Sequence, residues 1–412
     1  MVRASGAFGV RCLMRARSLV AVSGAYLDHA ATTPMRPEAL TRMVEALGED
    51  LGNPSGSHRG ARQALRAIDD AREVMAEVLG CRPGEVIFTG GGTEADNLAV
   101  RGSQAARPGD VSCSAVEHHA VLDVVEALGG VVWPVGADGR IDLDTLASGL
   151  DERAHTPTPV TFVSVMLANN EIGVITDLAE VRAVLDAHAP EATLHTDAVQ
   201  AFPWLDVAVQ AAPAGLVSVS AHKFGGPQGV GALVVRKGVP LAAQSLGGGQ
   251  ERGMRSGTQN VAGIVAMAAA AQATVSERDA TVARVAALRD RLADTVLARL
   301  DGVFETAVPI DEQGRPDRTG KIAGSCHLCF DGVENEALLF LLDQADVAAS
   351  AASSCASGAL DPSHVLAAIG VPRDTARGSL RLSLGATTTA DEVDHAAEVV
   401  VASVTRLRGH AT

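Results

Sequence analysis

The chain has few aromatic residues and little positive charge. Aromatics make up 3% of its 412 residues, with Tyr26 as the single tyrosine, so the core must consist mainly of Ala, Val and Leu. Its 34 Lys and Arg residues against 49 Asp and Glu leave a net charge of -15. Direct nucleic-acid binding requires a basic surface to neutralise phosphates, and this composition argues against one. We therefore expect no direct nucleic-acid partner.

Long apolar runs are also missing. The uncharged stretch 256–276 is rich in alanine, a weak membrane residue, and it contains several polar side chains. It predicts a buried helix of a soluble protein, with no membrane partner.

The six cysteines are scattered: Cys12, Cys81, Cys113, Cys326, Cys329 and Cys355. This is not a disulfide framework, and it favours a reducing compartment, which we take to be the cytoplasm. Cys326 and Cys329 form a CxxC in a strand-like run, without a second pair of ligands at zinc spacing. Residues three apart on a strand point to opposite faces, so we expect two packed core thiols and no metal site.

Residues 1–25 contain four arginines and no acidic residue. This resembles a targeting peptide in composition, but its apolar stretch is short and interrupted by glycine. We expect a disordered extension or a start codon assigned too early, with Met14 as an alternative start.

Strand-like and helix-like runs alternate through the first two thirds of the chain. Apolar runs at 86–89, 110–115, 160–166, 194–196, 216–220 and 231–236 are separated by helical patterns. The alternation predicts an α/β fold with a mainly parallel sheet, helices on both faces and a ligand beyond the strand carboxyl ends. A charged amphipathic helix at 277–300 follows. We place a large domain at 34–279 and a smaller C-terminal domain at 280–412.

Lys223 and Asp197 are the most informative pair. Lys223 follows the apolar run 216–219 within Ser220-Ala221-His222-Lys223, and Asp197 ends the preceding strand-like segment. An amine at a strand end can form a Schiff base, and a carboxylate can pair with a protonated pyridine nitrogen. The two together indicate pyridoxal 5'-phosphate (PLP). A solvated surface lysine is the alternative.

Three further clusters also fall at strand ends. Gly90-Gly91-Gly92-Thr93 precedes a helix, which suits a phosphate cradle or an ordinary strand–helix turn. His118 follows a strand and could either stack on a flat ring or cap a helix. Asn169-Asn170 could form a turn or present an amide to a ligand.

The C-terminal half adds three more candidates. The loop 247–258 combines glycines with two arginines, which suits either an anion-binding loop or an ordinary solvated loop. Cys355 lies among small residues at 350–358, where it is either a thiol on a mobile loop or an ordinary free cysteine. Arg381 lies in a strand-like run, where an arginine requires a carboxylate partner such as that of a substrate.

With these segments in order, the chain resembles the cysteine desulfurases of the NifS/IscS type. These are PLP-dependent enzymes of the class V aminotransferase family, with the type I transferase fold. The resemblance runs from Tyr26 to about Leu407. The matching motifs are Leu27 to Pro34, Gly52 to Ser55, Thr93-Glu94, Glu117-His118, Asn169 to Gly173, Asp197 to Gln200, Ser220 to Lys223, Arg252 to Thr258 and the Cys355 loop.

The resemblance implies a role for each matched position. Lys223 is the Schiff-base lysine, Asp197 pairs with the pyridine nitrogen and His118 stacks on the ring and manages a proton. The cofactor's remaining contacts are Gly92, Thr93, Asn170, Gln200, Ser220, His222 and, from the other subunit of a homodimer, Thr258.

For the substrate, the resemblance implies that Asn53 and Arg381 hold the carboxylate of L-cysteine and that Cys355 receives the sulfur. It implies no metal ligands, apart from contact between Cys355 and an iron–sulfur cluster during transfer. Residues 26–33 would join the small domain, which carries the Cys355 loop. Ala352 stands where the longer-loop group usually has glycine, which affects loop mobility and partner choice more than chemistry.

The implied reaction converts L-cysteine to L-alanine and passes sulfur, as a persulfide on Cys355, to iron–sulfur scaffold proteins or tRNA-thiolation enzymes. Two alternatives remain at this point. One is a selenocysteine lyase or cysteine-sulfinate desulfinase of the same fold, which need not use the thiol. The other is a non-catalytic sulfur-relay or scaffold-binding protein, which the catalytic residues present argue against.

Overall fold

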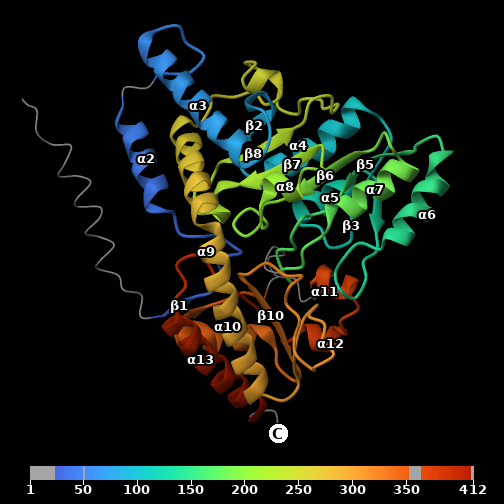
Figure 1. The fold of residues 1–412 in the computed structure, drawn as a ribbon, viewed down its shortest axis with the longest axis vertical. Helices are drawn as coiled ribbons and strands as arrows, with labels where there is room; N and C mark the ends of the chain where they lie inside the picture. Colours follow the sequence, from blue (N-terminus) through green and yellow to red (C-terminus); the bar gives the residue numbers. More distant parts are fainter. Residues whose placement is uncertain (1–23, 50–51, 352–362, 410–412) are drawn as a thin grey trace, which may run out of the picture.

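The computed structural model describes residues 24–49, 52–351 and 363–409. Residues 1–23 are not among them, so the expectation for the N-terminal extension, Met14 included, lies outside the described residues. A seven-stranded sheet occupies the upper part of Figure 1, with strand order β2-β8-β7-β6-β5-β3-β4. Its strands are β2 (Val86–Thr89), β3 (Asp110–Ser114), β4 (Val131–Trp133), β5 (Val160–Ser164), β6 (Thr193–Asp197), β7 (Leu216–Ser220) and β8 (Gly231–Val235).

This sheet is mainly parallel, as predicted. Strand β8 pairs antiparallel with both β2 and β7, whereas β7, β6, β5, β3 and β4 pair in parallel. Strand β2 therefore runs in the same direction as β7. The carboxyl ends of all strands except β8 meet at one edge, where the expected site residues follow β2, β3, β5, β6 and β7.

Helices cover both faces of the sheet. Alternate residues of β2 enter different apolar clusters: Ile87 packs with α4 and α5, whereas Phe88 packs in the larger core on the opposite face. Strands buried on both faces are continuously apolar, which explains the runs in the sequence. The helices of this region are α2 (Pro37–Gly48), α3 (Arg59–Val78), α4 (Gly92–Ala106), α5 (His119–Ala127), α6 (Leu143–Ala154), α7 (Leu178–His188) and α8 (Val207–Gln210).

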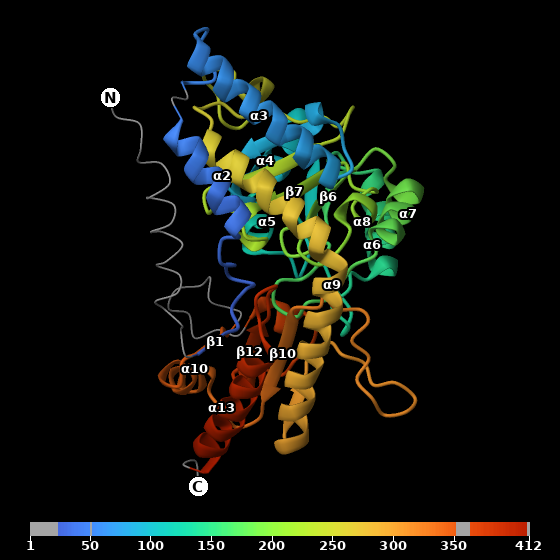
Figure 2. The ribbon, with the colours of Figure 1, turned by 60° about the vertical axis from the view of Figure 1, so that its left-hand side comes forward.

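One continuous helix, α9 (Val261–Arg299), replaces the two helical segments expected from the sequence. Asn260 caps it by accepting a hydrogen bond from the Gly263 N–H at 3.0 Å. Its first half packs beside α2 and α3, and its second half beside α13 and β10 (Figures 1 and 2). The expected domain boundary near residue 280 falls inside this helix and stays a prediction.

The C-terminal part, from β9 onward, contains a three-stranded antiparallel sheet, β12-β10-β9. Strand β10 carries the CxxC, and its two thiols lie in different apolar clusters, both fully buried, as expected for core cysteines. The N-terminal strand β1 (Ala25–Tyr26) pairs with β11 of this part. The elements of the C-terminal part itself are β9 (Val303–Glu305), β10 (Ser325–Phe330), β11 (Val347–Ala348), β12 (Ser379–Ser383), α10 (Asn335–Gln344), α11 (His364–Ala368), α12 (Arg373–Ala376) and α13 (Ala390–Gly409).

Candidate active site

A cavity of about 360 Å³ lies at the carboxyl edge of the large sheet. The residues that line it come from the N-terminal segment, from α4, from the ends of four strands, from the segment after β11 and from β12. Most of the residues expected from the sequence are here. Its lining is Asp28, Ala30, Ala31, Gly92, Thr93, Asp96, His118, Asn170, Asp197, Val199, Gln200, Ser220, His222, Lys223, Ser350 and Arg381.

Lys223 lies against the N-terminal segment and not in open solvent. Its Nζ donates to the carbonyl oxygens of Ala30 at 2.5 Å and Ala31 at 3.0 Å. Gln200 donates to the same Ala30 carbonyl at 2.7 Å. The amine is thus directed into the cavity by backbone acceptors from a segment almost two hundred residues earlier.

Asp197 ends β6 and is 4% exposed. Its Oδ1 accepts the Val199 N–H at 2.7 Å. Burial raises the pKa of Asp197 to about 6, although the Val199 hydrogen bond and the Lys223 charge oppose the shift. A buried carboxylate with so little compensation favours a cationic partner, such as a protonated ring nitrogen.

The start of α4 supplies backbone N–H groups beside the glycine run. A second cavity of about 660 Å³ there is lined by Gly90, Gly91, Gly92, Thr93, Ser220 and His222, among others. A Cβ on Gly92 would come within 3.0 Å of Val199 and 3.4 Å of Ser220, so glycine allows the close approach. A helix N-terminus with these neighbours is suited to a phosphate group.

His118 caps a helix, which is one of the two roles considered from the sequence; stacking on a flat ring stays a prediction. Its Nδ1 accepts the Ala120 N–H at 3.0 Å and so caps α5. Because Nδ1 is an acceptor, the neutral ring carries its proton on Nε2. Burial, and secondarily the Lys223 charge, lower the pKa of His118 to about 4, so this neutral tautomer prevails at neutral pH.

Of the two roles considered for Asn169-Asn170, the structure shows the turn, whereas contact between an amide and a ligand stays a prediction. Asn169 forms the turn, with its Oδ1 accepting the N–H groups of Glu171 and Ile172, each at 2.9 Å. Asn170 lines the cavity, and its carbonyl oxygen accepts from Arg381 Nη1 at 3.1 Å.

His222 and Arg381 complete the polar lining. The pKa of His222 is lowered to about 4 by burial and the Lys223 charge, and its Nδ1 lies 3.2 Å from the Thr32 hydroxyl. Arg381 is 5% exposed and pairs with Asp28, the carboxylate partner that its strand position required.

Two expected residues lie elsewhere in the single chain. Asn53 is in an exposed turn before α3, and Thr258 is in an exposed loop before α9. Neither lines the cavity. The two segments touch through Gln250, which donates to Ser55 at 3.3 Å and accepts the Gly257 N–H at 2.9 Å. Cys355 and Ala352 lie outside the described residues.

Two acidic residues that the expected site lacks line the cavity, Asp28 and Asp96, whereas Glu117 is fully buried and does not line it. Asp96 follows Thr93 by three residues on α4 and so shares a helix face with it. This three-residue spacing is the feature of the sequence that could place Asp96 beside Thr93 in the site. Asp28 and Glu117 lie in two of the motifs that match the family, Leu27 to Pro34 and Glu117-His118, but the sequence alone assigns them no role.

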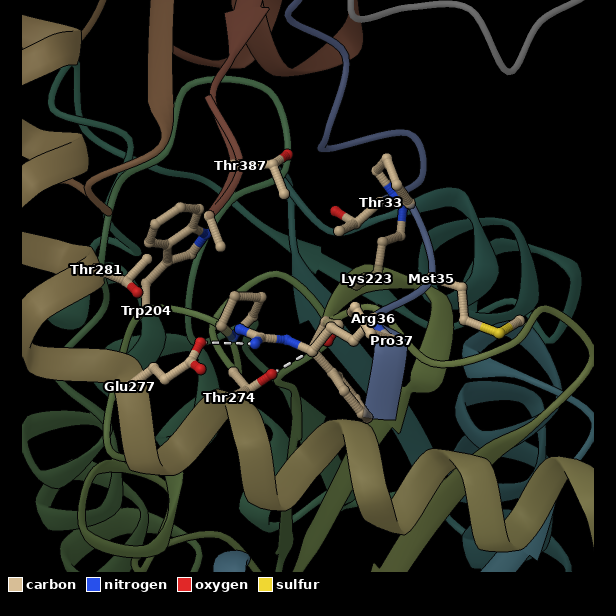
Figure 3. A pocket seen from close by; sticks show the side chains of 15 residues that line it. Thr33, Met35, Arg36, Pro37, Trp204, Lys223, Thr274, Glu277, Thr281 and Thr387 are labelled. Atoms are coloured by element: carbon tan, nitrogen blue, oxygen red, sulfur yellow. Dashed lines mark hydrogen bonds and ion pairs between the residues drawn. The ribbon is translucent and has the colours of Figure 1, made fainter. Parts of the chain in front are cut away.

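A separate cavity of about 240 Å³ lies between the segment 33–37 and α9 (Figure 3). Arg36 crosses it to pair with Glu277 at 2.7 Å. Lys223 contributes to its lining, but none of the other expected cofactor residues does. We therefore assign the chemistry to the 360 Å³ cavity.

Among the described residues, no group of three or more His, Cys, Asp or Glu side chains could hold a metal ion. Nor does any helix within those residues have the length and apolar character to cross a membrane.

Comparison with known proteins places the chain in a family. The class-V aminotransferase family matches residues 25–395. The chain is 45% identical to an IscS-like cysteine desulfurase of Mycobacterium tuberculosis, over 93% of this chain and 97% of that protein. It is 40% identical to a cysteine desulfurase of Cereibacter sphaeroides, over 93% and 96%.

Solved structures agree. A NifS-like protein superimposes with a TM-score of 0.83 at 31% identity, covering 93% of this chain and all of that one (100%). The protein SspA in complex with cysteine gives a TM-score of 0.72 at 28% identity, covering 89% and 100%. The chain belongs to the class-V aminotransferase family, as a member of its cysteine desulfurase group. The resemblance seen in the sequence and the predicted fold class are therefore confirmed.

Proposed function

We propose that the chain is a PLP-dependent cysteine desulfurase that converts L-cysteine to L-alanine and carries the sulfur as a persulfide on Cys355. The observation that carries the proposal is the convergence of Lys223, Asp197, His118 and Arg381 on one cavity. Its relatives support this function over the selenocysteine, sulfinate and non-catalytic alternatives.

The cavity fits PLP on grounds of chemistry. The α4 N-terminus suits the phosphate, Lys223 suits the aldehyde and Asp197 suits the ring nitrogen. Bound PLP would supply an electron sink for the substrate's Cα.

The protein's own residues would do the rest. Lys223 takes the α-proton at Nζ, Arg381 holds the substrate carboxylate, and His118 offers or accepts a proton at Nε2. The thiolate of Cys355 attacks the substrate sulfur. L-cysteine and the Cys355 thiol become L-alanine and a Cys355 persulfide, so atoms balance.

The scarcity of lysine makes the central test sharp. The chain has only three lysines: Lys223, Lys237 and Lys321. After borohydride reduction of the purified protein, peptide mass mapping should find a pyridoxyl group on Lys223 alone. A modification confined to Lys237 or Lys321, or none, would refute the assignment.

The role of Cys355 is tested separately. Cys355→Ser should retain PLP but lose persulfide formation with L-cysteine. Rates on cysteine, selenocysteine and cysteine sulfinate, with and without the thiol, separate a desulfurase from a thiol-independent lyase. Persulfide turnover surviving the substitution would refute this role.

We further propose a homodimer in which Asn53 and Thr258 complete the site of the other subunit. The support is their distance from the chain's own cavity and their shared exposed surface. Mixed Lys223→Ala and Thr258→Ala proteins should recover activity, because one hybrid site would have both intact residues. Activity no higher than that of either variant alone would contradict the exchange.

The sulfur acceptor and the location remain predictions. Iron–sulfur scaffold proteins and tRNA-thiolation enzymes both suit a persulfide donor. A cytoplasmic location rests on the cysteine usage alone. Persulfide transfer from the loaded enzyme to each purified acceptor, followed by mass spectrometry, would choose between the two acceptors.

A further inference from the structure

Five buried side chains form a hydrogen-bonded chain behind the cavity. They come from α4, β5, β6, β7 and the turn after β3, and none is more than 1% exposed: Asp96, Ser164, His195, Ser218 and Glu117. The Glu117 carboxyl lies 3.1 Å from the Ser164 hydroxyl, which lies 2.8 Å from His195 Nδ1. His195 Nε2 lies 3.0 Å from the Ser218 hydroxyl, which in turn bonds to Asp96.

If both carboxyls are ionised, this row of five side chains has more hydrogen-bond contacts than protons to fill them. It contains four contacts, and each requires one proton. Two hydroxyls and one neutral imidazole supply only three. The fourth must come from a carboxylic acid at one end or from a second proton on His195.

The surroundings select the carboxylic acid. His195 is fully buried and stacks on Phe162 at a ring distance of 5.7 Å, so burial lowers the pKa of His195 to about 3. Its Nε2 is 3.7 Å from Asp96 Oδ1, too far for a hydrogen bond. Asp96 Oδ1 has no hydrogen-bond partner among the described residues. Burying an ionised carboxylate oxygen without a partner is energetically costly, so the neutral acid is favoured.

Neighbouring charges act in the same direction. The ionisable groups that act on Asp96 are Asp197 and Glu117, and burial, followed by the charge of Asp197, raises its pKa. Burial and then Asp197 raise the pKa of Glu117 to about 8. Lys223 faces Asp197 and stabilises the charged form of Asp197.

We propose that Asp96 and Glu117 share one proton through Ser164, His195 and Ser218, and that this relay determines the charge beside Asp197. In one arrangement Asp96 donates to Ser218 and every bond points toward Glu117. In the other, all four bonds reverse and Glu117 donates. The proton number is the same in both.

The consequence for the cavity rests on the proposed role of Asp197. When the proton is on Asp96, that carboxyl is uncharged, and Asp197 can be the ionised group presented to a ring nitrogen. Asp96 is then a positioning residue that acts through Asp197. Asp96 lies on α4, the same helix whose N-terminus suits the phosphate. One helix would therefore contribute both to the phosphate end of the site and to the end at Asp197.

Infrared spectroscopy of the intact protein tests the shared proton directly. Above the titration of Asp197 (pKa about 6), the spectrum should contain the carbonyl band of one buried carboxylic acid. In Asp96→Asn the amide donates in place of the acid, so Glu117 ionises and the whole band disappears. In Glu117→Gln the opposite arrangement forms, and the band again disappears.

Other results would overturn the proposal. Loss of half the band in each variant would mean that each carboxyl holds its own proton. No band, with nitrogen NMR showing a doubly protonated His195, would mean an imidazolium. Both measurements can be made without PLP, so they stand whether or not Lys223 proves to bind it.

A second measurement tests the effect on the cavity. Glu117→Gln turns every bond toward Asp96 and leaves that carboxyl ionised beside Asp197, so PLP binding by the cofactor-free protein should weaken about tenfold. Asp96→Asn keeps that position uncharged and should weaken binding less. Ser112→Ala is the matched control, because Ser112 is equally buried but bonds to the Phe162 carbonyl outside the relay. Equal weakening by Glu117→Gln and Asp96→Asn would show that the charge of Asp96 does not act on Asp197 and would overturn the proposal. If Glu117→Gln does not fold, the infrared spectrum of Asp96→Asn decides.

Discussion

Arg381 and Asp28 face each other in the cavity, with Nη2 donating to Asp28 Oδ1 at 3.0 Å. The Asn170 carbonyl accepts from Nη1, and Nε has no hydrogen-bond partner among the described residues. The guanidinium is therefore held in place at the cavity wall, with Nε buried. Its positive charge and planar fork suit a substrate carboxylate in the cavity.

Replacing Arg381 should affect substrate binding more than turnover. Arg381→Lys keeps the charge but loses the planar fork, so KM for L-cysteine should rise about tenfold or more. Steady-state kinetics measure the split between KM and kcat. Arg377→Lys is the control, because Arg377 is 48% exposed and its nearest carboxylate contact, with Glu334, spans 3.9 Å. An unchanged KM with a reduced kcat would contradict a carboxylate-binding role.

The two roles of His118 can be separated by substitution. His118→Asn supplies another good N-cap for α5, so stability should stay close to that of the wild type. The imidazole is lost, and kcat should fall about a hundredfold or more. His118→Ala should lose both, with about 1 kcal/mol less stability. Urea unfolding measures the stability of each variant, and steady-state assays measure kcat. Full activity in His118→Asn would show that His118 only caps α5 and has no catalytic role.

Asp197 should oppose the stability of the cofactor-free protein. Its pKa is raised from 3.8 to about 6, so the folded state binds the proton more tightly than the unfolded chain does. The stability that this group contributes is present below pH 3.8 and is lost as pH rises through about 6.

Asp197→Asn should therefore stabilise the cofactor-free protein at neutral pH by on the order of 1–3 kcal/mol, while weakening PLP binding. Its unfolding free energy should also vary less with pH across that interval. Denaturant titrations across the interval check this. If the unfolding free energy of Asp197→Asn falls from acid to neutral pH by as much as that of the wild type, the prediction is wrong.

The buried pair of Arg72 and Glu251 should anchor the loop that leads to Thr258. Glu251 accepts from Arg72 at 2.7 and 2.9 Å and from the Phe88 N–H at 3.0 Å, at a left-handed φ of 47°. Glu251→Gln leaves Arg72 buried without its counter-charge, which should cost about 3–5 kcal/mol. Asp394→Asn, in an exposed pair with Arg291, should cost less than about 1 kcal/mol.

The same pair gives a pH dependence of opposite sign. Burial alone would raise the pKa of Glu251, but hydrogen bonds and the charge of Arg72 lower it below 4.5. Its contribution is therefore present above pH 4.5 and lost as pH falls below it. Comparable unfolding free energies for Glu251→Gln and the wild type at neutral pH would contradict this anchoring role.

Much of the fold and part of the site were predictable from the sequence. Continuous apolar runs separated by helical patterns predict a two-sided parallel sheet, because only strands covered on both faces are apolar at successive positions. In such a sheet the carboxyl ends meet at one edge. Lys223, Asp197, His118 and Asn170 each follow a strand, so their convergence could be expected before any coordinates.

Local sequence could not reveal the partners of these residues. The Ala30 carbonyl that accepts from Lys223 and the Asp28 carboxylate that pairs with Arg381 both come from the N-terminal segment, far from either residue in the sequence. His195, Ser164 and Ser218 look like polar interruptions in apolar strands. The register of the sheet pairs Ser164 with His195 and puts Ser218 two residues beyond Leu216, the residue of β7 that pairs with His195.

The sequence by itself determined which elements form and which residues end them, because hydrophobic period and turn chemistry are local properties. The tertiary structure decided which polar groups meet, which carboxyls are deprived of water and which predicted residues lie beyond reach of the cavity in one chain. Strand order and register bring together residues with no local signal of contact, and the resulting burial shifts their protonation.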